Sequence, residues 1–375
     1  MKIIIDDKIP YIKGALESFT EVIYLPGGEI TPEAVKDADA IVTRTRTICD
    51  ARLLKGSKVK FIATATIGFD HIDADYCQKA GIQWANAPGC NAESVHQYMA
   101  SALLSYARRN GIALAEKTIG IVGVGHVGSK VARLCRTIGM KVLLNDPPRE
   151  RLEGPGEFVD LEEIKRQADI ISFHVPLQRE GPDKTFHMVD NHFLKTLEKH
   201  PLLINTCRGE IFDSKAVLQA RRSEQISGLV IDCWEGEPDL DLDLLHSVDI
   251  ATPHIAGYSR DGKAKGTMAS IQNLSKFFNL NIDDWTPSGL EQPEDPCIEI
   301  DGSQKTEQSI LTEAVLSTYQ IEKDDATLRN APHQFEKLRG DYPVRREFGA
   351  YSVRARNIPE GLMEKMKSLG FSEFS

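Results

Sequence analysis

The sequence predicts an α/β protein with two doubly wound parallel-sheet domains, one Rossmann-type and one flavodoxin-like, and a small C-terminal α+β domain. Short apolar runs alternate with polar, helix-like stretches up to His254, which is the pattern of βαβ units. A glycine-rich turn at 123–128 follows one of these runs and opens a helix, as a dinucleotide-binding fold requires. The composition changes beyond residue 285, where prolines stand among acidic residues and predict a linker.

The strands of the first domain are apolar runs that have the length and spacing of a parallel sheet. They are 2–6, 21–25, 40–45, 60–66 and 82–87. A helix is predicted from Glu93 to Arg108, because its apolar residues recur at helical spacing. The strands of the second domain are 118–122, 141–146, 169–174, 201–206, 228–232 and 248–254.

The predicted domains follow from the order of these elements. The first domain takes 1–93 and 255–285, because the helical run after His254 begins when the second sheet is already complete. The second domain takes 94–254. The remainder, 286–375, is marginal in length for a domain that stands alone, so we expect it to dock on a second subunit.

The composition is that of a globular chain of 375 residues, with 41% apolar and 27% charged residues. The formal charge of -10 argues against nucleic acid or an anionic membrane as a partner. Seven scattered cysteines without a CxxC pair predict reduced thiols in a cytoplasmic protein. No apolar run reaches the length of a membrane span, and no spacing of His and Cys predicts a metal site.

The turn GVGHVG fits the GxGxxG pattern of NAD-binding loops, and its context of strand, turn and helix is complete. Gly123 allows the tight turn, Gly125 lets the backbone approach a pyrophosphate, and Gly128 lets the helix pack on the strand. The amides at the helix N-terminus, around His126 and Val127, then meet the phosphate charge.

An acidic residue, Asp146, ends the next strand about 20 residues further on. A carboxylate at this position accepts hydrogen bonds from ribose hydroxyls and repels a 2′-phosphate, so NAD is the expected cofactor. Arg149 and Arg151 follow closely, and they leave NADP open. The alternative interpretation is a glycine turn followed by an ordinary acidic strand end.

Three polar residues follow successive strands of the second domain, namely Arg208, Glu237 and His254. Ligands bind at the carboxyl ends of strands in open α/β sheets. The set suits hydride chemistry on a hydroxy acid, because arginine binds a carboxylate through two hydrogen bonds, histidine takes the hydroxyl proton, and glutamate orients the imidazole. Taken singly, each residue has an ordinary alternative: a solvated arginine, a loop acid or a structural histidine.

Four motifs in this order, GVGHVG, NTCRGE, DCWEGEP and TPHIAG, resemble the NAD-dependent D-2-hydroxyacid dehydrogenases. The resemblance covers residues 1–285. It implies that Arg208 binds and polarises the substrate, that Glu237 pairs with the histidine, and that His254 is the proton donor and acceptor. It also implies that Asp232 lies near the nicotinamide.

Further stretches are similar to the branch of this family that oxidises 4-phospho-D-erythronate to 2-oxo-3-hydroxy-4-phosphobutanoate in pyridoxal 5′-phosphate biosynthesis. They are TATIGFDHID, APGCNAESV, DPPR, FHVPL, HIAGYSRDGKAKGT, DDATLR and RREF. The similarity implies a homodimer formed through the C-terminal domain, and substrate contacts at Thr45, Thr66 and Tyr258. It implies cofactor contacts at Gly257 and, through the backbone, at Val175, where the family often has threonine.

The phosphate of such a substrate requires a cation of its own. Arg44 and Arg46 stand two apart in TRTRT, so they share a face if the segment is a strand end, with Thr45 on the other face. An irregular loop at this place is the other geometry that stays open. We therefore expect Arg44 or Arg46 to bind the phosphate. The alternative is a pair of surface arginines on an acidic protein.

Two other functions remain open. The first is another dehydrogenase of the same family, such as phosphoglycerate dehydrogenase, although the stretch after His254 and the C-terminal domain argue against it. The second is a non-enzymatic, NAD-sensing protein similar to the C-terminal binding protein corepressors, which keep the same three residues. Turnover of a 2-hydroxy acid would favour a dehydrogenase over the NAD-sensing protein.

Overall fold

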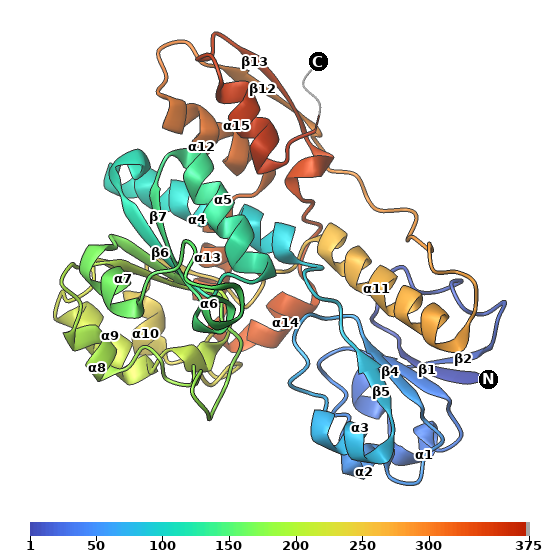
Figure 1. Ribbon diagram of the computed structural model, residues 1–375. Helices are drawn as coiled ribbons and strands as arrows, with labels where there is room; N and C mark the ends of the chain where they lie inside the picture. The colour runs from blue at the N-terminus through green and yellow to red at the C-terminus, as the bar shows by residue number, and fades with distance from the viewer. Residues whose placement is uncertain (373–375) are drawn as a thin grey trace. The chain divides into compact units, whose positions relative to one another are not determined.

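The computed structural model describes residues 1–372 and divides into two compact units (Figure 1). The N-terminal unit comprises Met1–Asn91 and Tyr258–Glu291, and the Rossmann unit comprises Ala92–Gly257 and the chain from Gln292 onwards. The predicted α/β class with doubly wound parallel sheets is confirmed. The separate C-terminal domain stays a prediction, because this part of the chain groups with the Rossmann unit.

The N-terminal unit is built on a parallel sheet with the strand order β2-β1-β3-β4-β5. Its strands are β1 (Lys2–Asp6), β2 (Glu21–Leu25), β3 (Ala40–Thr43), β4 (Phe61–Thr64) and β5 (Gln83–Ala85). Its helices are α1 (Pro32–Val35), α2 (Ala51–Leu54), α3 (Ala74–Ala80) and α11 (Arg260–Phe278). One face of the sheet packs against α1, α2 and α3, and the other packs against α11. The central strands are buried on both faces, which explains their continuous apolar runs.

The Rossmann unit is built on a parallel sheet with the strand order β11-β10-β9-β8-β6-β7. Its strands are β6 (Thr118–Val122), β7 (Lys141–Asn145), β8 (Ile170–Phe173), β9 (Leu202–Asn205), β10 (Gly228–Ile231) and β11 (Ile250–Ala251). The helices up to β11 are α4 (Ala92–Asn110), α5 (His126–Ile138), α6 (Pro147–Glu153), α7 (Leu161–Gln167), α8 (Asn191–Lys195), α9 (Ser214–Arg222) and α10 (Leu242–Ser247). Strand β6 pairs with β7 on one edge and with β8 on the other. This change of direction in the strand order is the point at which open α/β sheets bind ligands.

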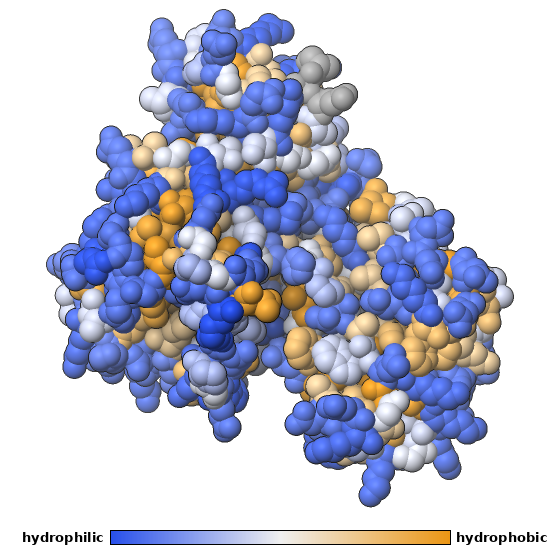
Figure 2. Space-filling view, in the orientation of Figure 1, coloured by the Kyte–Doolittle hydropathy of each residue, from blue (hydrophilic) through white to orange (hydrophobic). Residues whose placement is uncertain are grey.

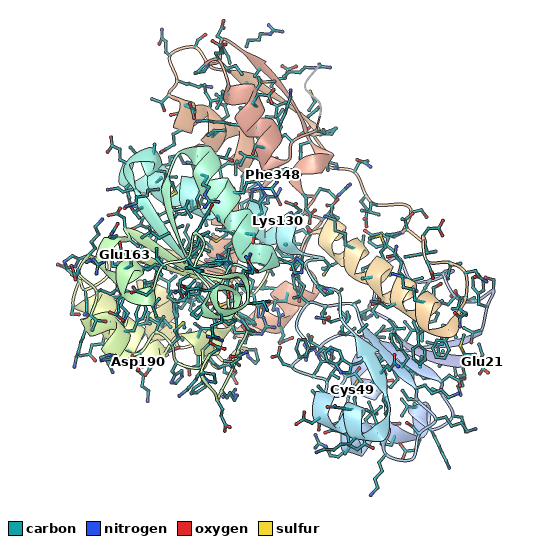
Figure 3. All side chains as sticks on the ribbon, in the orientation of Figure 1. Glu21, Cys49, Lys130, Glu163, Asp190 and Phe348 are labelled. Atoms are coloured by element: carbon teal, nitrogen blue, oxygen red, sulfur yellow. The ribbon has the colours of Figure 1, made fainter. Side chains whose placement is uncertain are left out.

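The C-terminal segment, which we define as residues 292–372, packs onto the Rossmann unit. Strands β12 (Cys297–Asp301) and β13 (Ser352–Arg356) pair in parallel. The helices of the segment are α12 (Glu307–Thr318), α13 (Ile321–Asn330), α14 (Phe335–Gly340) and α15 (Leu362–Leu369). Helix α12 lies against α4, α13 against β11, and α15 against α5. The ring of Phe348, labelled in Figure 3, meets His96 of α4 edge to face at 5.6 Å.

Many helices begin where an aspartate follows a strand or a turn. The aspartates whose side chains accept hydrogen bonds from the amides of the first turn are Asp50, Asp73, Asp146, Asp160, Asp190, Asp213 and Asp241. Short 3-10 turns lie at Gly27–Glu29, Leu114–Glu116, Gly209–Ile211, Pro332–Gln334 and Phe348–Ala350. Local sequence therefore sets the starts of these helices, and the sheets set their orientation.

Hydrophilic side chains cover most of the face shown in Figure 2, and apolar side chains form smaller groups between them. Within residues 1–372, no helix combines the length and the apolar character needed to cross a membrane.

Candidate active site

The glycine turn joins β6 to α5 at the switch point of the Rossmann sheet. A Cβ atom on Gly128 would lie 1.9 Å from the backbone oxygen of Gly123, so only glycine lets the helix approach the turn this closely. Gly125 stands at the N-cap of α5, and no side chain in the described part of the chain caps this helix. A Cβ on Gly125 would meet no described atom within 4 Å apart from its chain neighbours, so no side chain from elsewhere in the described chain crowds this position. Amides at such a helix N-terminus attract a phosphate group.

Asp146 follows β7 and links the glycine turn to α6. Its Oδ2 accepts a hydrogen bond from the Val124 amide at 2.8 Å, and its Oδ1 accepts one from the Arg149 amide at 3.1 Å. A carboxylate offers about four acceptor positions, so Asp146 retains capacity for ribose hydroxyls. The residues at this end of the sheet therefore fit the adenosine half of NAD.

The cations near Asp146 are already paired with carboxylates. Arg149 donates to both oxygens of Glu153, from Nε and from Nη2, at 2.7 Å each. Arg151 forms an ion pair with Asp183 at 2.5 Å. Arg149 also donates from Nη1 to the Val124 carbonyl of the glycine turn at 2.6 Å. Both arginines are therefore already paired with carboxylates, and this pairing favours NAD over NADP.

The remaining predicted residues of the glycine turn and its border lie close to β6. His126 is exposed and Val127 is half-buried in the first turn of α5. Val175 follows β8, and its Cγ1 would lie 2.8 Å from a Cβ on Gly123. Val175 therefore borders the glycine turn, as its predicted role requires.

Arg208 stands in the loop after β9, and a buried amide side chain fixes its backbone. Nδ2 of Asn205 donates to the Arg208 carbonyl at 2.8 Å, and Oδ1 accepts from the Cys207 amide at 3.1 Å. Asn205 is fully buried, so it acts as a template for the loop. We did not predict a role for Asn205, although an asparagine at a strand end before a polar loop is a signal that could have indicated it.

The loop of Arg208 lies directly against the loop that carries Glu237. A Cβ on Gly209 would lie 2.0 Å from the carbonyl carbon of Trp234, so only glycine permits this contact. The Arg208 side chain itself is half-buried, and its Nη1 donates to the Cys207 carbonyl at 2.8 Å. The close backbone contact fixes the spacing between the two loops.

His254 and Glu237 form a hydrogen-bonded pair. Nδ1 of His254 lies 2.6 Å from Oε1 of Glu237, and Oε2 of Glu237 accepts a hydrogen bond from the Trp234 amide at 3.2 Å. Burial raises the pKa of the Glu237 carboxyl, but the hydrogen bond and charge of His254, the charge of Arg339 and the Trp234 amide together outweigh burial, so the pKa lies below its ordinary value. An ionised Glu237 directs the Nδ1 proton and leaves Nε2 as the proton acceptor, and no described residue bonds to Nε2.

Asp232 holds the loop that carries His254. The side chain is fully buried, and burial raises the pKa of its carboxyl. Its Oδ1 accepts from the Ile255 amide at 2.8 Å, and its Oδ2 accepts from the Ala256 amide at 2.9 Å. The structure therefore gives Asp232 contacts with the loop. Its approach to the nicotinamide stays a prediction, as does the cofactor contact of half-buried Gly257.

Of the two geometries left open for Arg44 and Arg46, the structure shows the irregular loop and not the strand end. Strand β3 ends at Thr43, because the following residues form a turn in place of extended backbone. Arg44 donates to both oxygens of the buried Asp6, from Nε at 3.2 Å and from Nη2 at 3.3 Å. Thr45 and Arg46 are exposed at the turn.

The other predicted substrate residues of the N-terminal unit are half-buried. Oγ1 of Thr66, just after β4, donates to the Gly68 carbonyl at 2.8 Å. The ring of Tyr258 lies under the ammonium group of Lys263 at 4.5 Å. The structure thus brings Arg208, Glu237 and His254 together in the Rossmann unit, whereas the predicted substrate residues belong to the N-terminal unit.

Two further polar side chains near the glycine turn and the Arg208 loop are held uncharged by burial. Burial lowers the pKa of His174 to about 3, and Nε2 of this ring lies 2.9 Å from Oγ of Ser172. Burial raises the pKa of the Cys207 thiol to about 11. Neither group therefore carries charge into the site near neutral pH.

Comparison with known families and structures defines the class of protein. The family model described as the D-isomer specific 2-hydroxyacid dehydrogenase, NAD binding domain, matches residues 91–256, and a domain of unknown function matches residues 292–370. The cofactor (NAD+)-bound 3-phosphoglycerate dehydrogenase of Entamoeba histolytica has a TM-score of 0.65 at 26% identity, covering 77% of this chain and 99% of that chain. The D-lactate dehydrogenase of Aquifex aeolicus, complexed with NAD and lactic acid, has a TM-score of 0.63 at 27% identity, covering 76% of this chain and 97% of that chain. The fold and the site are those of an NAD-dependent dehydrogenase.

One relative narrows this class further. The erythronate-4-phosphate dehydrogenase of Bacteroides fragilis is 52% identical over 355 residues, which are 94% of this chain and 99% of the relative. The chain belongs to the erythronate-4-phosphate dehydrogenase family, within the D-isomer specific 2-hydroxyacid dehydrogenases. The predicted resemblance and the predicted cofactor, NAD, are confirmed. The roles of individual residues stay predictions.

Proposed function

We propose that the protein oxidises 4-phospho-D-erythronate to 2-oxo-3-hydroxy-4-phosphobutanoate with NAD, as a step of pyridoxal 5′-phosphate biosynthesis. The observation that carries this proposal is the hydrogen bond of 2.6 Å between His254 and Glu237, beside the Arg208 loop in an NAD-binding unit. The 52% identity to an erythronate-4-phosphate dehydrogenase supports the choice of substrate.

The reaction follows from the chemistry of these side chains. The Arg208 guanidinium binds the substrate carboxylate and the oxygen on C2, and its charge polarises the C–O bond. Nε2 of His254 accepts the hydroxyl proton, and the Glu237 carboxylate stabilises the imidazolium that forms. When bound, NAD accepts the hydride from C2, so the products are the 2-oxo acid, NADH and one proton. Thr45, Thr66 and Tyr258 stay predicted substrate contacts.

A substrate panel tests the proposal. Steady-state rates with NAD are measured on phosphorylated and unphosphorylated 2-hydroxy acids of three and four carbons. We expect the highest kcat/KM with 4-phospho-D-erythronate. Turnover of 3-phosphoglycerate without turnover of 4-phospho-D-erythronate would favour a phosphoglycerate dehydrogenase, and no turnover of any 2-hydroxy acid would favour the NAD-sensing alternative.

The predicted phosphate cation is Arg44 or Arg46, and the two variants are expected to behave differently. Arg46→Ala should raise KM for the phosphorylated substrate more than for its unphosphorylated analogue. Arg44→Ala leaves the buried Asp6 carboxylate without its cation, so we expect a loss of stability of about 1–3 kcal/mol as well. Equal losses on phosphorylated and unphosphorylated substrates would remove both residues from phosphate recognition.

We also propose that the protein is a cytoplasmic homodimer joined through the C-terminal segment. The similarity to the 4-phospho-D-erythronate branch and the free state of the cysteines support these assignments. Light scattering after size-exclusion chromatography measures the oligomeric state, and a monomer at micromolar concentration would contradict the dimer.

A further inference from the structure

An arginine of the C-terminal segment holds the loop that carries His254. Nη2 of Arg345 donates to the Ala256 carbonyl at 2.6 Å and to the Ile255 carbonyl at 3.2 Å. The side chain is only 4% exposed, and the same nitrogen bonds to Oγ of Ser94 in α4. A charged donor buried on two carbonyls of one loop fixes the position of that loop.

The same two residues are also held through their amide groups. Asp232 accepts the hydrogen bonds of the Ile255 and Ala256 amides, so each of these residues has its N–H bonded to Asp232 and its C=O bonded to Arg345. His254, immediately before them, has a left-handed backbone with φ of 53°. A conformation of this kind persists only where the surrounding contacts over-determine it. The side chains of Asp232 and Arg345 supply those contacts.

The Arg345 guanidinium is itself held in a built site of the C-terminal segment. Its carbon Cζ lies 4.5 Å from the centre of the Tyr319 ring and 5.8 Å from the centre of the Tyr342 ring. Both tyrosine hydroxyls donate to Oδ2 of Asp324, at 2.8 Å and 2.7 Å. The two rings and the nearby carboxylate therefore restrict the orientation of the Arg345 guanidinium, which contacts the loop of His254.

Helix α13 of the segment also forms hydrogen bonds with the backbone that precedes His254. Oδ1 of Asp325 accepts the Ala251 amide of the edge strand β11 at 2.7 Å. Arg329 donates to the Leu245 carbonyl at 2.8 Å and to the Val248 carbonyl at 2.7 Å. The backbone from the end of α10 to Ala256 is therefore bonded to the C-terminal segment at successive points.

We propose that the C-terminal segment positions the loop of His254, Ile255 and Ala256, and that Arg345 is the positioning residue that acts through His254. This inference rests on the proposed role of His254 as the proton acceptor. Arg345 itself touches neither substrate nor cofactor in this proposal. Its contribution is to keep Nε2 of His254 at a fixed place, so that its loss affects the chemical step more than binding.

The kinetic test compares Arg345→Met and Arg345→Lys with Arg354→Met, which makes the same change at an exposed arginine of β13. Because small displacements of a catalytic group are costly, Arg345→Met should lower kcat by at least about tenfold at saturating NAD and substrate. KM for the substrate and Kd for NADH should stay within about threefold of the control. Arg345→Lys retains the charge without the planar fork, so its kcat should lie between those of the other two.

Hydrogen exchange gives a readout that does not require activity. In Arg345→Met the amides of Ile255 and Ala256 should exchange faster, whereas those of β6 and β8 should exchange at the rate of the control. If the wild type turns over a different 2-hydroxy acid, the proposed substrate is wrong and the kinetic test proceeds with that acid. If the wild type turns over no 2-hydroxy acid, the exchange rates of the Ile255 and Ala256 amides alone test whether Arg345 positions the loop.

Two results would overturn the inference. One is a kcat for Arg345→Met within about twofold of Arg354→Met, even if its thermal stability is lower. The other is unchanged exchange at Ile255 and Ala256. If Arg345→Met does not fold, Arg345→Lys takes its place under the same criteria, because it retains the buried positive charge.

Discussion

At the scale of single residues, His254 combines an unusual backbone conformation with a hydrogen-bonded ring. Its φ of 53° lies in the left-handed region, which costs a residue with a side chain about 1–2 kcal/mol. Asp232 and Arg345 bond to the two residues that follow and hold this conformation in place. The energetic cost of the left-handed backbone therefore falls on His254, the residue whose imidazole ring must keep one orientation beside Glu237.

Removal of the His254 ring should affect chemistry and leave cofactor binding intact. We expect His254→Ala to lower kcat by about 10²–10⁴-fold, because the variant loses its general base. Kd for NADH, measured by fluorescence titration, should stay within about threefold, since the pyrophosphate and ribose contacts lie elsewhere. His246→Ala, at an exposed histidine of α10, is the matched control. Loss of NADH binding together with activity would indicate a structural histidine.

Glu237 should make stability depend on pH in a defined direction. Burial raises the pKa of its carboxyl, but His254, Arg339 and the Trp234 amide together lower it below the ordinary 4.5 in the folded protein. The folded state therefore binds this proton less tightly than the unfolded state, and the stabilisation is complete above the unfolded pKa and lost as pH falls through the folded value. We expect wild type to exceed Glu237→Gln in free energy of unfolding at about pH 5.5, with the difference shrinking at lower pH. Urea denaturation at each pH measures it, and a difference that grows towards low pH would contradict the assignment.

At the scale of elements, the length and spacing of the apolar runs predicted the strands of both sheets, because these strands are buried on both faces. Apolar residues at helical spacing predicted α4, which the structure buries continuously from Ser94 to Ala107. The end of β3 was predicted too late, since Arg44 leaves the strand to reach Asp6, which stands 38 residues away. Asn205 and Arg345 were not predicted as part of the site. The partners of Arg345 include loop carbonyls that lie up to 90 residues away in sequence, so the stretch RREF does not indicate this contact. Asn205 opens the stretch NTCRGE and bonds to Cys207 and Arg208, so a local pattern was present there and was missed.

The packing of α5 on β6 gives a test at this scale. In Gly128→Ala the new Cβ would lie 1.9 Å from the Gly123 oxygen, and backbone must move to relieve the overlap. We expect a loss of stability of about 1–3 kcal/mol, which thermal unfolding measures. Binding of NADH should weaken by at least about tenfold, because the first-turn amides that face the pyrophosphate are displaced.

A second glycine of the Rossmann unit provides the control for this variant. A Cβ on Gly340, in α14, would meet no described atom within 4 Å, so Gly340→Ala should keep the stability and NADH affinity of the wild type. Unchanged NADH affinity in Gly128→Ala would show that the glycine turn does not hold the pyrophosphate in the way that its geometry indicates.

At the scale of the whole molecule, the chain forms two units with separate hydrophobic cores, and the residues that fit NAD belong to one of them. The C-terminal segment shares the core of the Rossmann unit through Leu328 and Phe335. Helix α15 of the segment also packs on α5, the helix whose N-terminus faces the predicted pyrophosphate site. Stabilisation by the cofactor should therefore spread through the Rossmann unit as far as the C-terminal segment.

Hydrogen exchange with saturating NADH tests this distribution. A ligand at about 100 times its Kd stabilises the folded state that binds it by about 2.7 kcal/mol, which slows exchange through global unfolding by about 100-fold. We expect this protection in β6, β8, β9 and α13, and no change in β1, β3 and β4 of the N-terminal unit. Equal protection of both sets would mean that the two units unfold together in one cooperative transition. Protection of the sheet strands without protection of α13 would mean that the C-terminal segment unfolds separately from the sheet on which it packs.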